Sequence, residues 1–381
     1  MDNLKELREK IDSIDDVITE KYVERLNICD EIARIKQADK KAVSDPAREE
    51  KILYRVTENV PEELRLYVKD LYFSIFSASK ARQNALISKG SPTTDRIKEI
   101  LGGELKDLPM RAAVACQGVK GANSGAAAVK FFPISDITYF KNFEGVFSAV
   151  ESGLCEYGVL PIENSTAGSV LEVYDLMKKY DFHIVRSLRL KIEHCLAGVK
   201  GASKNTVKKV ISHPQALRQC AEYISENKLE TEESENTAVA AKRVAESGDA
   251  NIAVLCSPDC AELYGLKIIE RSVQDESNNF TRFICIGKEL DVKKGSDKIS
   301  VMTTLPHKSG SLNGLLTKFS AIGLNLTKIE SRPIAGTDFE FMFYFDFDGD
   351  VSDPKVLGLI SELENSSDKF VFLGTYKEIL G

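Results

Sequence analysis

Cationic side chains fall within an apolar helical stripe near the N-terminus, where they could hold an anionic ligand. Arg25 lies between Ile18 and Ile32 on this stripe. Lys36 follows Arg25 by close to three helical turns, so the two side chains share a face. An unpaired buried charge is costly, so these cations need anionic partners, and for Arg25 a buried glutamate would also serve. The spacing of Arg8 rotates it well off this face, which suits a neighbouring subunit's site better than its own.

Further polar residues of the same segment are predicted to lie on two later helices. Asp45, Arg48 and Glu49 occupy one end of the second helix, at spacings that bring side chains together. Ser79 and Gln83 are one turn apart on the third helix. Taken singly, each has an ordinary structural explanation: Asp45 can be a helix N-cap, and Ser79 can be a hydroxyl at a helix-packing contact.

Strand-to-helix junctions supply a second kind of binding group in the middle of the chain. We predict four of them, at residues 117–124, 163–169, 212–215 and 235–237. Each offers free backbone N–H groups and a partial positive charge, which bind carboxylates or phosphates, and together they would suit a small dianion. The Ser, Thr and Asn residues can equally be ordinary caps, and His213 an ordinary turn residue. Gly118 and Gly121 do not complete a dinucleotide-binding fingerprint.

The elements that carry the first group are helices. Residues 4–38 contain no Gly or Pro and predict one helix of roughly 50 Å. Asp45 and Pro46 predict the start of a second helix, and Pro61 opens a third that runs to about Ser88. A helix so much longer than its neighbours cannot bury its stripe within one small three-helix unit. We therefore expect residues 1–90 to form an all-α domain whose long helix is shared in a dimer.

The rest of the chain alternates between strands and helices. Between linkers at 88–110, with a short helix, and 288–297, we expect an α/β domain over 111–287. Its strands are predicted at 111–116, 156–161, 182–187, 209–212, 251–255 and 281–286. A last domain, 298–376, is predicted to follow the ferredoxin-like βαββαβ order. Its elements are strand 299–304, helix 310–322, strands 324–332 and 338–347, helix 353–364 and strand 369–375.

Composition narrows the class of protein. The net charge of −7 and the pI of about 5.5 make nucleic acid a poor candidate partner. The eight cysteines form no CxxC pair and are expected to be buried free thiols, so no metal site is predicted. The charged N-terminus does not resemble a signal peptide, and no apolar run is long enough to span a membrane. We expect a cytoplasmic protein.

Residues 7–83 closely resemble the AroQ-type chorismate mutase domain, an intertwined all-helical dimer, once one small gap is placed before Tyr67. The resemblance covers the polar positions of that family's active site. The matching residues here are Arg8, Arg25, Lys36, Asp45, Arg48, Glu49, Ser79 and Gln83. Chorismate is a dicarboxylate that rearranges to prephenate without a covalent enzyme intermediate, so catalysis rests on holding the folded conformer and stabilising developing charge.

The resemblance also implies a role for each of these residues. Arg25 and the partner subunit's Arg8 would bind the carboxylates of chorismate. Lys36 and Gln83 would donate hydrogen bonds to the breaking ether oxygen, and Glu49 would hold the ring hydroxyl. Three further residues would complete the shell around the substrate: Arg48, Asp45 and Ser79.

Residues 111–287 resemble the prephenate dehydratase domain, in which two α/β lobes enclose the site as in a periplasmic binding protein. The resemblance lies in the strings Pro161-Ile-Glu-Asn-Ser-Thr, His194-Cys-Leu, Ser212-His-Pro-Gln-Ala-Leu, Asn236-Thr-Ala and Asn279-Phe-Thr-Arg-Phe. It departs at residues 117–124, which lack the family's Gly-Pro-x-Gly loop.

The dehydratase resemblance identifies candidate site residues. Thr281 is implied to be the key catalytic residue, and Glu163, Asn164 and Gln215 are implied to assist it. The reaction needs a proton donor for the leaving hydroxyl, and Thr281 could donate directly or relay a proton. Two further candidates would bind the substrate: Ser169 and Arg282. Arg282 could instead form a structural salt bridge, which we favour slightly.

The C-terminal segment resembles ACT regulatory domains of these enzymes through Ser309-Gly-Ser-Leu-Asn and Glu330-Ser-Arg-Pro. The resemblance implies that phenylalanine binds between the domains of two subunits. The candidate residues for this allosteric site are Gly310, Ser311, Leu312, Asn313, Glu330, Ser331, Arg332 and Pro333. A domain that only dimerises is the alternative.

The three resemblances together predict a homodimeric or homotetrameric enzyme of phenylalanine biosynthesis. It would convert chorismate to prephenate and prephenate to phenylpyruvate, without a metal or organic cofactor, and phenylalanine would inhibit it. We expect no nucleic-acid or membrane partner. The alternatives are a non-catalytic amino-acid sensor, a dehydratase that prefers arogenate and, less favoured because no dinucleotide fingerprint is present, a prephenate dehydrogenase fusion.

Overall fold

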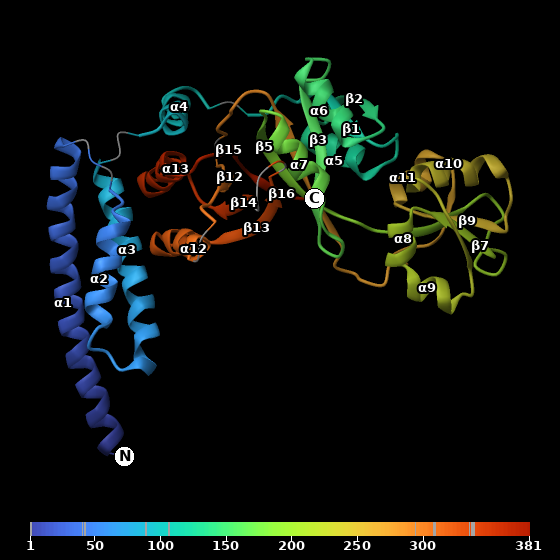
Figure 1. Ribbon diagram of the computed structural model, residues 1–381. Coiled ribbons are helices and arrows are strands. Elements are labelled where there is room, and N and C mark those ends of the chain that lie inside the picture. The colour runs from blue at the N-terminus through green and yellow to red at the C-terminus, as the bar shows by residue number, and fades with distance from the viewer. Residues whose placement is uncertain are drawn as a thin grey trace. The chain divides into compact units, whose positions relative to one another are not determined.

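The computed structural model describes residues 2–39, 41, 43–87, 90–105, 107–293, 295–307, 310–334, 336 and 340–381. The chain divides into two compact units, whose elements are labelled in Figure 1. One unit combines Met1–Gly103 with Ile299–Phe372, and the other combines Glu104–Lys298 with Leu373–Gly381. The last nine residues thus belong to the α/β unit and not to the unit that precedes them in sequence.

The N-terminal segment is helical, as predicted. It forms α1 (Asp2–Ala38), α2 (Pro46–Thr57), α3 (Arg65–Ile87) and the short α4 (Pro92–Leu101). The Asp45 carboxylate accepts a hydrogen bond from Arg48 N at 3.0 Å and Pro46 follows it, which confirms the predicted cap. A short 3-10 helix, Glu62–Leu64, follows Pro61 before α3 begins, and the predicted end at Ser88 lies outside the described residues.

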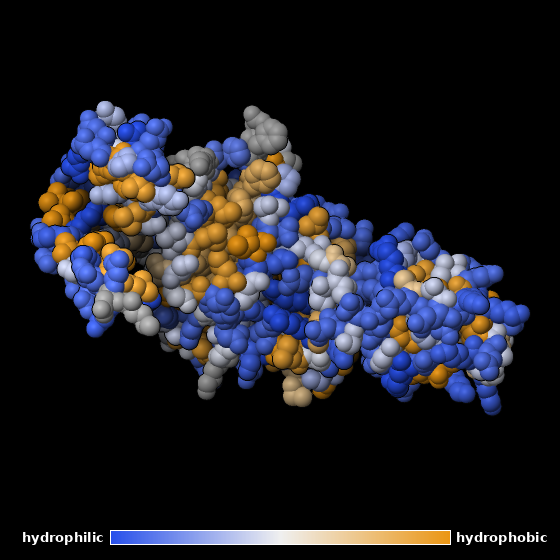
Figure 2. Space-filling view, turned by 90° about the horizontal axis from the view of Figure 1, so that it is seen from below, coloured by the Kyte–Doolittle hydropathy of each residue, from blue (hydrophilic) through white to orange (hydrophobic). Residues whose placement is uncertain are grey.

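The apolar stripe of α1 is only partly covered within one chain. Cys29 and Ala33 are buried and α1 packs on α3, but Ile14 is 58% exposed and Ile18 is 55% exposed. Apolar side chains gather on the exposed surface of these helices in Figure 2. Exposed apolar area on this scale marks an interaction surface.

The C-terminal part of the same unit has the predicted βαββαβ element order. Its strands are β12 (Lys298–Thr304), β13 (Leu326–Pro333), β14 (Phe341–Asp348) and β15 (Phe370–Tyr376), and its helices are α12 (Ser311–Ala321) and α13 (Pro354–Ser366). The strands are arranged in the order β13-β14-β12-β15. Phe319 of α12 packs against Phe345 and Phe347 of β14, which joins helix to sheet in one core.

The α/β unit contains two sheets. The first has the strand order β16-β5-β11-β3-β1-β2, with β4 beside β3. Its strands are β1 (Arg111–Gln117), β2 (Ile134–Phe140), β3 (Tyr157–Asn164), β4 (Gly168–Ser169), β5 (His183–Lys191), β11 (Phe280–Gly287) and β16 (Glu378–Leu380). Helices pack against it: α5 (Asn123–Phe131), α6 (Phe143–Glu151) and α7 (Leu171–Lys179).

The second sheet has the strand order β10-β6-β9-β7-β8. Its strands are β6 (Cys195–Gly198), β7 (Lys209–Ser212), β8 (Glu230–Glu233), β9 (Ile252–Cys256) and β10 (Lys267–Glu270). Its helices are α8 (Pro214–Gln219), α9 (Ala221–Glu226), α10 (Thr237–Ser247) and α11 (Pro258–Leu263). The chain enters this lobe after β5 and returns at β11, so the predicted two-lobed α/β arrangement is present.

All six predicted strands of the α/β domain are present, and the structure adds others. Among the strands that sequence reasoning missed, β8 has the sequence Glu-Thr-Glu-Glu and no apolar residue to signal it. The short strands β4 and β16 form by pairing with β3 and β5, which local sequence does not reveal. The predicted cysteine burial is confirmed, since all eight thiols are free and buried.

Candidate active sites

Arg25 and Ser79 are brought together where α1 packs on α3. The Arg25 guanidinium donates a hydrogen bond to the Ser79 hydroxyl, which itself donates to the Ile75 carbonyl at 2.6 Å. Arg25 is therefore bonded to a neutral hydroxyl, where a buried glutamate was considered as its partner. Gln83 lies one turn further along α3, and its Oε1 is buried with no hydrogen-bond partner among the described residues. This helix pair thus combines a cation with polar groups that a ligand can engage.

The other predicted residues of the helical site have partners of their own. The Lys36 ammonium donates to the Val43 carbonyl at 2.7 Å, and Glu49 pairs with Lys80 at 3.0 Å. Lys80 was not singled out from the sequence, although it follows Ser79 directly. A substrate that uses Lys36 or Glu49 must compete with these contacts.

Arg8 does not join this group within one chain. It is exposed on α1 and lies roughly 25 Å along the helix axis from Arg25, since seventeen residues separate them. One chain alone therefore presents an incomplete set of the predicted residues.

The α/β unit contains a cleft of about 450 Å³ that takes side chains from both lobes. Asn164, Ser169, Gln215 and Thr281 line it, as predicted. Many of the remaining lining residues come from the predicted junctions. They include Ala122, Asn123, Ser124, His213, Glu235, Asn236 and Thr237.

Asn164 fixes the position of Thr281 in this cleft. The Asn164 Nδ2 group lies 2.9 Å from Thr281 Oγ1, 2.8 Å from Asn279 Oδ1 and 3.1 Å from the Phe280 carbonyl. The Asn164 Oδ1 atom accepts from the Thr166 hydroxyl at 2.7 Å and from Ala167 N at 2.9 Å, so the amide cannot rotate. Thr281 Oγ1 accepts from Asn164, which leaves the hydroxyl proton of Thr281 able to donate to a ligand.

A chain of hydrogen bonds continues from Asn164 to the second lobe. Gln219 Nε2 donates to Thr166 Oγ1 at 2.9 Å, and Gln219 Oε1 lies 3.0 Å from His194 Nε2. Because an amide oxygen only accepts, His194 Nε2 carries the proton and Nδ1 is an acceptor. That Nδ1 atom is buried without a partner in the described part of the chain. Burial lowers the pKa of His194, which keeps the imidazole neutral.

Sequence reasoning gave neither His194 nor Gln219 a role. The signal for Gln219 was its position one helical turn after Gln215, on the same face of α8. His194 lay within a quoted family string, but nothing in the sequence alone placed it opposite Gln219.

Three of the four predicted helix N-termini are confirmed. Asn236 caps α10 by accepting from Val239 N at 2.8 Å, and α5 begins at Asn123. His213 is the N-cap of α8, where its Nδ1 accepts from Gln215 N at 3.2 Å. The prediction for residues 163–169 was wrong: they form the end of β3, a turn and β4, and α7 begins only at Leu171, because β4 pairs back on β3.

Glu163 and Arg282 do not line the cleft. Successive side chains of a strand point to opposite faces, so these two residues lie on the face away from Asn164 and Thr281. Arg282 is 4% exposed and its guanidinium lies 3.0 Å from Glu163 Oε1, which is the structural salt bridge considered as its alternative. The expected direct contact of Glu163 and Arg282 with a ligand is therefore not supported by their placement.

The predicted allosteric residues lie at two element ends in the C-terminal part. Gly310 has a φ of +84° and precedes Ser311, Leu312 and Asn313 in the first turn of α12. Ser311 Oγ is buried without a hydrogen-bond partner among the described residues. The other four residues end β13: Glu330, Ser331, Arg332 and Pro333. Ser309 of the quoted motif lies outside the described residues.

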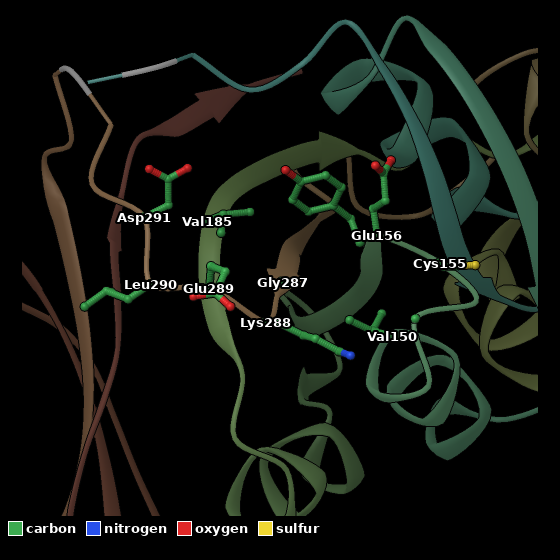
Figure 3. A pocket seen from close by; sticks show the side chains of 11 residues that line it. Val150, Cys155, Glu156, Val185, Gly287, Lys288, Glu289, Leu290 and Asp291 are labelled. Carbon is green, nitrogen blue, oxygen red and sulfur yellow. The ribbon is translucent and has the colours of Figure 1, made fainter. Parts of the chain in front are cut away.

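A second hollow of about 300 Å³ lies at the other end of β3 and β11 (Figure 3). Tyr157, Gly287 and the carboxylates of Glu156 and Asp291 lie around it. Burial raises the pKa of Tyr157 to about 12. None of the residues predicted for catalysis lines this hollow, so the cleft at the Thr281 end is the candidate dehydratase site.

Two other kinds of feature are absent from the described residues. These residues contain no group of three or more His, Cys, Asp or Glu side chains placed to hold a metal ion. In the same ranges, no helix combines the length and the apolar character needed to cross a bilayer.

Two family models match the chain in the order predicted. Residues 7–84 match chorismate mutase type II, and residues 114–291 match prephenate dehydratase. The bifunctional chorismate mutase/prephenate dehydratase of Escherichia coli (strain K12) is 30% identical over 382 residues, which cover 97% of this chain and 95% of the relative.

Two further relatives match most of the chain. Arogenate dehydratase/prephenate dehydratase 1, chloroplastic, of Arabidopsis thaliana is 34% identical over 282 residues, covering 70% of this chain and 72% of the relative. A solved structure of prephenate dehydratase from Arthrobacter aurescens in complex with L-Phe is 27% identical, with a TM-score of 0.64. The match covers 70% of this chain and 89% of that one.

Proposed function

Because this chain belongs to the family of bifunctional chorismate mutase/prephenate dehydratases, we propose which of its residues carry each reaction and how phenylalanine controls them. The two activities belong to phenylalanine biosynthesis. We assign the mutase to residues 1–90, the dehydratase to residues 111–287 and regulation to residues 298–376.

The dehydratase reaction is assigned to the cleft around Thr281. Prephenate loses its ring carboxylate as carbon dioxide while the C–O bond to the ring hydroxyl breaks, and the departing oxygen must gain a proton to leave as water. The Thr281 hydroxyl supplies or relays that proton. The observation that carries this assignment is the 2.9 Å contact from Asn164 Nδ2 to Thr281 Oγ1, because accepting this bond leaves the hydroxyl proton available to a ligand in the cleft.

The remaining residues of the cleft hold the dianionic substrate. The N-termini of α5 and α10 present backbone N–H groups at Asn123 and Thr237, which suit the carboxylates of prephenate. Ser169 and the Gln215 side chain line the same cavity and add neutral hydrogen-bonding groups. Aromatisation of the ring supplies much of the driving force, so the protein needs only to orient the substrate and protonate the leaving oxygen.

The mutase reaction is assigned to the contact of α1 with α3. Arg25, held by Ser79, binds a carboxylate of chorismate, and the partner subunit's Arg8 binds the other. Lys36 and Gln83 stabilise charge on the breaking ether oxygen. Glu49 takes the ring hydroxyl. The second-helix residues Asp45 and Arg48 complete the shell.

A homodimer completes the mutase site. The exposed stripe of α1 needs a partner, and Ile14 and Ile18 lie at its centre. A second copy of the same helix supplies both the missing apolar surface and the distant Arg8. We propose a homodimer or homotetramer on this basis.

The C-terminal part is proposed to be a ferredoxin-like ACT domain that binds phenylalanine. The support is its βαββαβ order, the positive φ of Gly310 beside α12, and the L-Phe complex of the similar Arthrobacter aurescens enzyme. Feedback inhibition requires phenylalanine to bind one conformational state more tightly than another. The ligand groups are proposed to come from residues 310–313 and 330–333.

The test is phenylpyruvate formation from chorismate as the sole substrate, with and without phenylalanine. Product that falls when phenylalanine is added supports the three assignments together. Prephenate that accumulates without phenylpyruvate contradicts the role of Thr281 and leaves the mutase assignment intact. Neither product would favour the non-catalytic amino-acid sensor.

Arogenate is the second candidate substrate of the cleft, since the similar Arabidopsis thaliana protein is named for both arogenate and prephenate. Arogenate carries an amino group where prephenate carries a keto group, so its dehydration would give phenylalanine directly. Comparing kcat/KM for the two compounds on the purified chain decides between them. A higher value for arogenate would overturn the assignment of prephenate.

A further inference from the structure

The last residues of the chain extend the catalytic sheet. Strand β16 pairs in parallel with β5, with Glu378 opposite Ser187 and Leu380 opposite Arg189. Gly374 has a φ of +146°, and a Cβ atom there would collide with the carbonyl oxygen of Ile184. The backbone of the tail, residues 373–381, is therefore fitted closely against β5 and not loosely attached to it.

Two side chains of this tail reach Arg282, which is buried on β11. The Arg282 Nη2 atom donates to the Tyr376 hydroxyl at 3.0 Å, and Arg282 Nε lies 3.4 Å from Glu378 Oε1. Arg189 of β5 lies directly opposite Arg282 in the ladder, so two cations face each other. Glu378 relieves this repulsion, because its second oxygen, Oε2, pairs with Arg189 Nε at 2.5 Å.

Arg282 in turn holds the strand that carries Asn164. Its Nη1 atom donates to Glu163 Oε1 at 3.0 Å, and Glu163 and Asn164 are consecutive on β3. The ladder between β11 and β3 shifts register between Arg282 and Phe283, where Phe283 pairs with Pro161 and Ile162 is the extra residue. A bulge weakens backbone pairing and lets strand ends bend. The Thr281–Asn164 pair lies beyond this bulge. There the Arg282–Glu163 ion pair joins the two strand ends on one face, and the Asn164 amide joins them on the other.

We propose that the tail, residues 373–381, positions the Thr281–Asn164 pair of the dehydratase site, with Tyr376 and Glu378 acting through Arg282 and Glu163. Tyr376 and Glu378 are positioning residues, since neither lines the cleft. Residues 373–381 follow the C-terminal sheet in sequence but pack in the catalytic unit, which gives the final residues of the chain a role in the reaction. This inference rests on the proposed role of Thr281.

The test uses Glu378→Gln and Tyr376→Phe in the full chain, with both activities measured on each preparation. Glu378→Gln keeps the shape of the side chain but removes the charge between Arg189 and Arg282. We expect its dehydratase kcat to fall about tenfold, with a smaller fall for Tyr376→Phe and little change in KM for prephenate. Mutase kcat should not change, because the helical residues belong to the other compact unit. Lys377→Gln is the matched control, since this exposed side chain lies between the two tested residues in the tail and outside the Arg282 contacts.

The outcomes separate this inference from the proposed function. A wild-type chain that does not dehydrate prephenate would contradict the proposed function itself. A wild-type chain that does so, while both variants keep kcat within about twofold, would overturn the role of the tail, even if their melting temperatures fall.

A double variant tests the route through Glu163. Because Tyr376 is proposed to act through Arg282 and Glu163, adding Tyr376→Phe to Glu163→Gln should lower kcat by clearly less than it does in the wild type. Effects that multiply independently would show that Tyr376 does not act through this pair.

Discussion

The helical site and the α/β cleft differ in the groups that build them. Around α1 and α3, the predicted mutase residues are mostly charged, and they pair with a hydroxyl, a carbonyl or Lys80. In the cleft, a chain of neutral amides, hydroxyls and one imidazole runs from Thr281 to His194. The first site lacks Arg8 and an apolar cover within one chain. The second takes all its predicted cavity residues from one chain.

This difference follows from what each reaction needs. A pericyclic rearrangement moves no proton to or from the protein, so fixed charges around a folded dianion are sufficient. Dehydration must protonate a leaving oxygen, so the site needs one hydroxyl whose proton points in a set direction. A connected network of neutral groups gives that direction, because each hydrogen bond fixes the orientation of the next group.

The largest effect that separates the two sites is expected from Thr281→Val. Valine keeps the shape but removes the hydroxyl, so dehydratase kcat should fall about 10³-fold. Asn164 Nδ2 keeps Asn279 Oδ1 and the Phe280 carbonyl as acceptors, so the fold should tolerate the change. Steady-state rates with prephenate and with chorismate measure both activities on one sample.

Thr281→Ser is the matched control, since it retains the hydroxyl. It should keep most of the activity that Thr281→Val loses. Equal losses in the two variants would mean that the shape of the side chain matters and its proton does not. The contrast between a proton-donating cleft and a purely electrostatic helical site would then disappear.

Arg25→Gln tests the charge-based site in the same way. Losing the guanidinium should lower mutase kcat/KM about 10²-fold, because the carboxylate of chorismate loses its cation. Dehydratase activity should stay at the wild-type level. Arg82→Gln is the control: Arg82 joins the same two helices through Asp30 at 2.6 Å, but that pair is on the surface and stabilises little. A similar mutase loss in both variants would point to helix packing instead of charge.

A charged residue on the exposed stripe tests whether the helical site needs a second chain. Ile14→Glu combined with Ile18→Glu places charges where the partner is proposed to pack. We expect a monomer in sedimentation velocity and a mutase rate at least about tenfold lower in dilute solution, recovering as protein concentration rises. Ile14→Val with Ile18→Val should remain oligomeric. A monomer with full mutase activity would show that one chain completes the site.

The sequence predicted the helices and buried strands well because their signals are local. The uninterrupted stretch to Ala38 and the Asp45–Pro46 cap fix α1 and the start of α2 without reference to the rest of the chain. Strand β9 and the second half of β11, from Phe283, are runs of apolar residues. In contrast, β8 and β16 exist only because a neighbouring strand offers its edge, and no local pattern marks them.

The cleft of the α/β unit was predicted only in part, because some of its features depend on strand pairing and not on local sequence. Thr281, Asn164, Ser169 and Gln215 line the cavity as expected, but the strand phase of Glu163 and Arg282 turns them away from it. Changing the phase of a strand by one residue moves its side chains to the other face, and the register shift beside Arg282 is not visible in sequence. The pairing of His194 with Gln219 depends on two segments that only the folded lobe brings together.

The smallest effect concerns the buried imidazole at the end of the neutral network. The pKa of His194 is lowered below 6.5 by burial, so the unfolded chain takes up a proton first as the pH falls. The free energy of unfolding is therefore unaffected by His194 above about pH 6.5. It decreases as the pH falls from 6.5 towards the lowered pKa of the folded state. His194→Gln cannot take up this proton but can still donate to Gln219 Oε1. The difference in melting temperature between wild type and variant should change by roughly a few degrees between about pH 7.5 and about pH 5.5, in the variant's favour at acid pH.

The comparison isolates His194 because His213, whose pKa burial also lowers, stays in both proteins. Dehydratase kcat of His194→Gln should fall only about threefold, far less than that of Thr281→Val, since His194 lies at the far end of the hydrogen-bond chain. A pH-independent difference in melting temperature would mean that His194 is accessible to protons in the folded state. The cleft would then hold an ionisable group, as the helical site does, and the distinction between a neutral and a charged site would have to be given up.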